Sequence, residues 1–125
     1  MRKPKDQIER RKDRIQGLFI AIKDASILIL KEHIEKFPKD TFEETNKYLC
    51  DGNHCPKKAA ICDEYEYQTG VRPRRIEEYL DNLVNTKRVV MAGHTSKTHV
   101  FLGEKYAKEE FKKLKEAQKA EENPK

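Results

Sequence analysis

Arginine and lysine side chains gather in two stretches of the chain that suit contact with an anionic partner. Residues 1–23 contain eight basic and three acidic side chains, a net charge of +5, and residues 72–103 contain six and three, a net charge of +3. Residues 24–71 between them carry six basic and ten acidic side chains, a net charge of −4. Two basic regions on either side of an acidic segment are typical of a domain whose two ends contact a polyanion. An ordinary solvent-exposed surface gives the same pattern.

Three cysteines and a histidine lie close together in the sequence, at Cys50, His54, Cys55 and Cys62. Zinc accepts thiolate and imidazole ligands, but the spacing lacks the paired C-x2-C arrangement. We therefore expect no metal and no cofactor, and interpret the cysteines as thiols that pack in the interior. Two alternatives stay open: a zinc site made by these four residues, and a Cys50–Cys55 disulfide in an oxidising compartment or a thermophile's cytoplasm.

Sequence patterns of the common catalytic sites are missing from the chain. It contains no glycine-rich phosphate loop, no nucleophile elbow and no HExxH pair. The four histidines (His33, His54, His94 and His99) are scattered, and we interpret them as surface or packing residues. We expect that the protein is not an enzyme.

The apolar spacing predicts a long helix over residues 5–37, with Gly17 as a weak point for a bend or break and Pro38 as its end. From Leu18 onward the apolar face widens over much of the helix, which indicates burial on more than one side. This face, together with a thin apolar stripe in the C-terminal helix, predicts a homodimer interface. Packing of the two terminal helices within one chain is the alternative.

Local signals divide the middle of the chain into short helices. Thr41 and Glu44 form a capping box that begins a helix ending near Leu49. Residues 57–67 fit another helix, which Thr69-Gly70 closes with glycine in the left-handed conformation.

The second half of the chain contains a further helix and a β-hairpin. Pro73 suits the first turn of a helix over residues 72–86, in which Ile76, Leu80, Leu83 and Val84 form one inward stripe. Residues 88–92 and 98–102 then have the period of strands around a Gly/Thr/Ser loop. A charged helix follows from Glu104 and frays over residues 121–125.

The order of helix, glycine turn, helix and hairpin over residues 59–103 resembles the winged helix-turn-helix DNA-binding superfamily, of the small prokaryotic or archaeal type. The residues that carry the resemblance are Ala60-Ile61-Cys62, the turn Thr69-Gly70-Val71, the helix Arg74 to Val84, and the hairpin Lys87 to Leu102. The resemblance implies a mainly α fold with a small β-hairpin wing (α+β) and extra N- and C-terminal helices. The expected parts are a basic helical extension (1–17), the winged helix domain (18–103) and a charged C-terminal helix (104–125).

In such a domain the recognition helix, here 72–86, enters the major groove of duplex DNA, and the wing, here 88–102, contacts the adjacent backbone or minor groove. The predicted DNA contacts are Arg72, Arg74, Arg75, Tyr79 on the outward side, Lys87, Arg88, His94, Thr95, Ser96 and Lys97. Arg10, Arg11, Lys12 and Arg14 are expected to reach further phosphates.

Acidic residues on the expected recognition helix leave a second hypothesis open. Glu77, Glu78 and Asp81 repel phosphate, although carboxylates can accept hydrogen bonds from cytosine. Pairing of these acids with Arg74, Arg75 or Arg88 is the other expectation. The first hypothesis is a transcriptional regulator or nucleoid-associated protein that binds double-stranded DNA as a homodimer. The alternative is a winged helix adaptor that binds another protein in replication or DNA segregation. RNA binding is a third possibility, but the sequence does not show the aromatic platform that recognition of single-stranded RNA usually needs.

The chain shows no secretory signal, and its most apolar stretch, Leu18 to Leu30, is too short to span a bilayer. We therefore expect a cytoplasmic, nucleoid-associated protein without a membrane partner.

Overall fold

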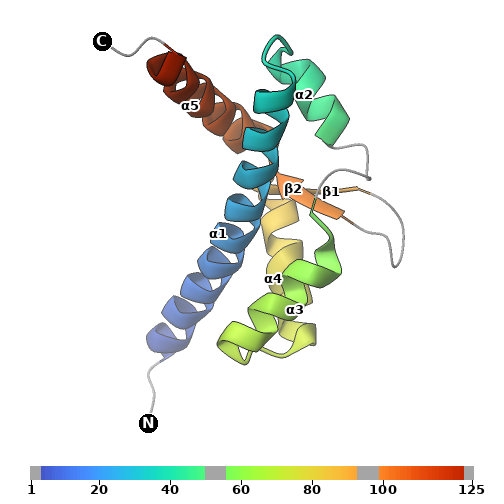
Figure 1. Cartoon of the computed structure of the whole chain (residues 1–125). Coiled ribbons are helices and arrows are strands. Elements are labelled where there is room, and N and C mark those ends of the chain that lie inside the picture. The colour runs from blue at the N-terminus through green and yellow to red at the C-terminus, as the bar shows by residue number, and fades with distance from the viewer. Residues whose placement is uncertain (1–3, 50–55, 93–98, 123–125) are drawn as a thin grey trace.

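The computed structural model describes residues 4–49, 56–92 and 99–122. Within these ranges the elements are α1 (Pro4–Lys36), α2 (Phe42–Leu49), α3 (Lys58–Thr69), α4 (Pro73–Asn85), β1 (Val89–Ala92), β2 (His99–Leu102) and α5 (Glu104–Glu122). The predicted fold class is confirmed: the protein is mainly α with a small antiparallel hairpin (Figure 1).

Helix α1 runs the length of the molecule and is the element around which the others are arranged (Figure 1). It passes Gly17 without interruption, so the expected boundary between residues 17 and 18 is not a helix end. Helices α3 and α4 lie along the first part of α1, and α2 and α5 lie near its C-terminal end (Figure 1). The start of α1 and the end of α5 therefore lie at opposite ends of the molecule.

The predicted capping box at the start of α2 is confirmed. The backbone amide of Glu44 donates to Thr41 Oγ1 at 3.2 Å, and the amide of Thr41 donates to Glu44 Oε1 at 3.2 Å. These reciprocal bonds satisfy two amides that lack a partner in the first turn of a helix.

The turn between α3 and α4 has the predicted geometry. Gly70 adopts a φ of 73°, and its amide donates to Glu66 O at 2.8 Å, which ends α3. Thr69 Oγ1 donates to the Tyr65 carbonyl and accepts from the Val71 amide. Pro73 then begins α4, so the two helices are joined by a short, hydrogen-bonded turn.

The hairpin pairs Val89 with Leu102 and Ala92 with His99. All four residues of β2 are buried, because the strand packs against α1 as well as β1. Strand β2 also pairs on its other edge: the Val100 amide donates to Pro56 O at 2.9 Å, next to an antiparallel bridge between Lys57 and His99. This third strand position was not predicted from the sequence, because it is too short to have a periodic pattern.

One hydrophobic core joins α1, α4, α5 and the hairpin. Fully buried members include Leu18, Ile22, Leu30, Ile76, Leu80, Leu83, Val89, Val100, Phe101, Leu102 and Ala107. Helix α5 packs on α1 of the same chain, with the Phe19 and Tyr106 ring centroids 5.3 Å apart. Part of the apolar surface that suggested a dimer is therefore covered within the chain, whereas Ile20 and Leu28 stay 46% and 60% exposed.

Candidate nucleic-acid interface

A groove of about 650 Å³ lies between the N-terminal part of α1 and the α3–α4 turn. Six of the ten residues that line it are arginines, three from α1 (Arg10, Arg11, Arg14) and three from the start of α4 (Arg72, Arg74, Arg75). The other four are Thr69, Gly70, Val71 and Tyr79. In Figure 1 the α3–α4 turn lies at the level of the beginning of α1. The structure thus brings two separate basic stretches into one site.

The arginines from α4 lie at the positive end of that helix. Arg72 is the N-cap residue, and its carbonyl accepts from the amides of Arg75 and Ile76 at 3.0 and 3.1 Å. The side chains of Arg72, Arg74 and Arg75 are exposed. Guanidinium charge and the helix dipole act in the same direction here, and both favour an anion in front of the helix.

The arginines from α1 are positioned by a buried tyrosine. Tyr65 on α3 is 4% exposed, and its hydroxyl donates to the backbone carbonyl of Arg14 at 2.6 Å. Burial raises the pKa of Tyr65, and neighbouring Tyr79 raises that pKa further, so the hydroxyl stays protonated as a donor. Its ring lies 3.7 Å from where a Cβ atom of Gly17 would stand. This contact fixes α3 against α1 beside the arginines.

The expectation that Tyr79 lies on the outward side of α4 is wrong. Its side chain is 1% exposed and forms part of the core under the groove. The spacing contains the signal for this: Tyr79 follows Ile76 by three residues and precedes Leu83 by four, which places all three on one helix face. Tyr79 therefore packs in the core beneath the groove, and its side chain is not exposed for contact with a ligand.

The groove arginines have no ion-pair partner among the carboxylates that the structure describes. Glu77 pairs instead with Lys58 on α3, with Nζ and Oε1 2.7 Å apart. Glu78 and Asp81 are exposed and do not line the groove. Six like charges around one depression repel one another, so binding a polyanion relieves the repulsion.

Arg88 has a different environment from the groove arginines. It is half-buried, its guanidinium lies 5.8 Å from the Phe19 ring centroid, and its nitrogens donate to Thr86, Gln16 and Asn82. These contacts tie the start of the hairpin to α1 and α4. The structure therefore gives Arg88 a role in the fold, and its guanidinium is not presented freely to a partner.

Two further predicted contacts, Lys12 and Lys87, do not line the groove. Lys12 is exposed on α1 without lining the groove, and Lys87 is exposed before β1 with a φ of 62°. The predicted wing-tip contacts His94, Thr95, Ser96 and Lys97 fall outside the described residues, as do Cys50, His54 and Cys55.

Within the described ranges, no three His, Cys, Asp or Glu side chains come together as a metal site. Cys62 is a free, half-buried thiol whose pKa is raised by burial and then by the charge of Glu77. His33 is buried and hydrogen-bonds Asp40 at 3.1 Å, and His99 is buried in β2. Both histidines act as packing residues.

No family model, curated protein or solved structure matches this chain. Among the described helices, none is long and apolar enough to cross a membrane.

Proposed function

We propose that this protein binds double-stranded DNA as a winged helix-turn-helix protein, with α4 as the recognition helix and the β1–β2 hairpin as the wing. A transcriptional regulator or a nucleoid-associated protein fits this role. The observation that carries the proposal is the single groove lined by six arginines at the start of α4. The additional pairing of β2 with Pro56 supports the winged helix assignment, because it places a strand position directly before the first helix of the motif.

The two sets of arginines have different roles in this proposal. Those of α1 extend from a helix anchored by Tyr65, and they hold the phosphates of one strand. Those of the first turn of α4 reach base edges in the major groove, where arginine binds guanine through two hydrogen bonds. Glu77 does not oppose this arrangement, because it pairs with Lys58 and does not line the groove.

A homodimer forms part of the same proposal. Ile20 and Leu28 lie two turns apart on α1 and are exposed, although most of the apolar face of this helix is covered by α4, α5 and β2. A second copy that covered these two side chains would remove their apolar surface from water. Two copies would present two recognition helices to one DNA site.

A protein-binding adaptor is the second candidate, and the exposed apolar side chains of β1, one on each face of the strand, favour it. Val90 and Met91 are 37% and 40% exposed on adjacent positions, and the exposed acids of α4 give the same half of the molecule a mixed character. Apolar and mixed-charge surfaces are more typical of protein interfaces than of DNA interfaces.

Fluorescence anisotropy of a labelled mixed-sequence duplex, measured over a series of salt concentrations, tests the proposal. We expect binding that weakens steeply with salt. Each phosphate contact contributes about 0.9 to the slope of log K against log salt, so Arg10→Ala/Arg14→Ala should lower the slope by up to about 1.8. Arg74→Ala/Arg75→Ala should weaken binding and reduce discrimination between sequences.

The matched control is Lys31→Ala/Lys36→Ala, which removes two exposed charges from α1 outside the groove. This variant should leave the slope unchanged within about 0.5. If the folded protein does not bind at low salt, DNA binding is excluded and the adaptor becomes the working hypothesis. If the control lowers the slope as much as the groove variants do, the binding is a general effect of net charge.

A further inference from the structure

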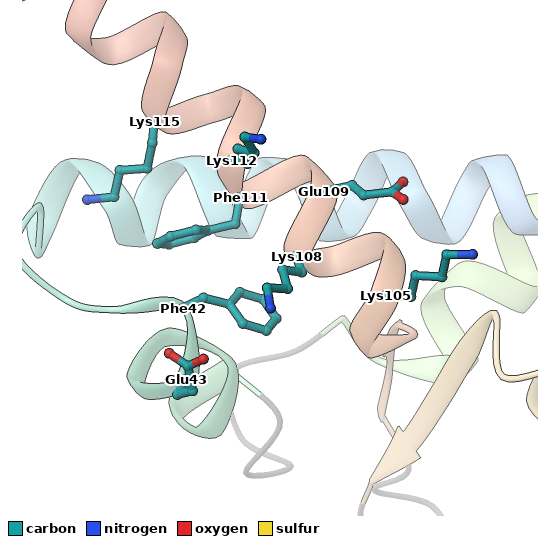
Figure 2. A pocket seen from close by; sticks show the side chains of 8 residues that line it. All are labelled: Phe42, Glu43, Lys105, Lys108, Glu109, Phe111, Lys112 and Lys115. Atoms are coloured by element: carbon teal, nitrogen blue, oxygen red, sulfur yellow. The ribbon is translucent and has the colours of Figure 1, made fainter.

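A second cavity, also of about 650 Å³ and widely open to solvent, lies between α2 and α5 (Figure 2). These two helices lie near the C-terminal end of α1, whereas the arginine groove lies at its beginning (Figure 1). Its volume falls in the range of small-molecule sites, about 300–1,000 Å³. The lining residues are Phe42, Glu43, Lys105, Lys108, Glu109, Phe111, Lys112 and Lys115.

The interior of this cavity is aromatic. Phe42, at the start of α2, is 8% exposed, and Phe111 on α5 is half-buried. Their ring centroids are 5.6 Å apart in an edge-to-face arrangement. Figure 2 shows both rings between the two helices. The exposed parts of these rings suit contact with hydrocarbon, and a charge placed against them would be unfavourable.

The two walls are connected by specific contacts. The Lys115 ammonium donates to the carbonyl of Pro38, which lies between α1 and α2, and it sits 5.5 Å from the Phe111 ring centroid. The capping box of Thr41 and Glu44 holds the first turn of α2. The cavity is therefore largely formed before a ligand arrives, which lowers the entropy cost of binding.

Lysines of α5 border one side of the apolar interior. Lys105, Lys108, Lys112 and Lys115 are spaced three or four residues apart on α5, so they follow one face of that helix. The first three are exposed, and no described carboxylate forms an ion pair with them. Glu43 and Glu109 contribute two negative charges, which leaves the lining with a net charge of +2.

We propose that this cavity binds an amphipathic carboxylate, with its apolar chain against Phe42 and Phe111 and its carboxylate among Lys108 and Lys112. An aromatic interior inside a cationic border is complementary to a molecule with one hydrocarbon part and one anionic end. The combination distinguishes this ligand class from neutral lipids, which leave the lysines unpaired, and from polyanions, which do not use the phenylalanines.

An NMR titration of the ¹⁵N-labelled protein with sodium decanoate, kept below its micelle concentration, tests the proposal. We expect saturable shifts in α2 and α5 and none around Arg72 to Arg75. Between hexanoate, octanoate and decanoate the Kd should fall about fourfold per added CH₂. Decanol, which has the same chain length without a charge, should bind at least about tenfold more weakly.

Two double variants separate the ligand site from general charge effects. Lys108→Gln/Lys112→Gln should weaken decanoate binding about tenfold or more. Lys31→Gln/Lys119→Gln removes the same charge from exposed positions outside the cavity and should leave the Kd unchanged. Phe111→Leu keeps an apolar side chain and should weaken decanoate more than hexanoate.

Four outcomes would overturn the proposal: no saturable shifts, equal affinity for decanol and decanoate, equal loss of binding in both lysine variants, or shifts of the same residues on raising the protein concentration alone. The last would show that a second copy of the chain occupies the cavity. None of these readouts depends on DNA, so the result is independent of the proposed DNA binding.

Discussion

Gly103 lies where β2 meets α5, and a Cβ atom at this position would stand 2.1 Å from the backbone carbonyl oxygen of Lys87. Its amide donates to Arg88 O at 2.8 Å, which holds the two backbones together. Only the absence of a side chain permits this approach. Glycine is needed here because of the neighbouring backbone and not because of its own conformation, since Gly103 does not have a positive φ.

We predict that Gly103→Ala lowers the free energy of unfolding by more than about 3 kcal/mol, because backbone must move to relieve the overlap. Gly70→Ala is the comparison: its φ of 73° disfavours alanine, but no atom lies within 4 Å of the added methyl. That substitution should cost about 1 kcal/mol. Urea denaturation followed by circular dichroism measures both, and equal losses would contradict the proposed overlap.

Tyr65→Phe removes the hydroxyl that donates to Arg14 O and should cost about 1 kcal/mol at neutral pH. The pH dependence identifies the same group. The folded pKa of Tyr65 is raised above its ordinary value of 10.0, so on alkalinisation the unfolded chain releases this proton first. The stabilisation is complete below the unfolded pKa and declines as the pH rises through the folded pKa.

Urea midpoints measured between about pH 8 and about pH 11 should therefore fall more steeply for the wild type than for Tyr65→Phe. The difference between the two curves isolates Tyr65 from the other tyrosines and lysines. Parallel curves would show that ionisation of Tyr65 does not change the stability of the folded protein between these pH values.

At the scale of single elements, α2 depends on its cap more than a longer helix would. It has eight residues, fewer than an isolated helix needs to be stable in water. Its position is fixed by the capping box at one end and by the buried residues Phe42, Thr45 and Leu49. Because α2 forms one wall of the second cavity, its stability and that cavity are linked.

We predict that Thr41→Ala destabilises the protein by about 1 kcal/mol through loss of the reciprocal cap. Thr41→Ser keeps the hydroxyl and should be nearly neutral. Thermal unfolding measures the two variants. An alanine variant as stable as the wild type would mean that water replaces the cap without cost.

At the scale of the whole molecule, the two candidate binding sites lie at opposite ends of α1. The arginine groove is polar and suits phosphate, whereas the cavity between α2 and α5 is aromatic with a lysine border. The exposed Ile20 and Leu28 lie on the length of helix between them.

If the protein is a homodimer through this part of α1, sedimentation equilibrium should give twice the monomer mass. Ile20→Ser/Leu28→Ser should then produce a folded monomer. Tyr67→Ser is the control, since Tyr67 is 88% exposed and belongs to α3 and not to α1. A wild-type protein that stays monomeric at all concentrations would exclude the dimer, and dissociation by the control would place the interface elsewhere.

The sequence by itself determined the backbone elements, because their signals are local. Helical spacing, the Thr41–Glu44 cap, Gly70 and Pro73 each act within a few residues, and the structure confirms these elements. The spacing of the apolar residues of α4 also indicates that Tyr79 is buried, although we expected it on the outward side.

Only the tertiary structure decided how side chains from distant elements combine. Arg14 and Arg72 share a groove because Tyr65 fixes α3 against α1, and Arg88 is tied to the fold because Gln16 and Phe19 lie beside it. Phe42 and Phe111 make a cavity because α5 turns back onto the end of α1. Contacts of this kind depend on how helices pack, which short-range periodicity does not specify.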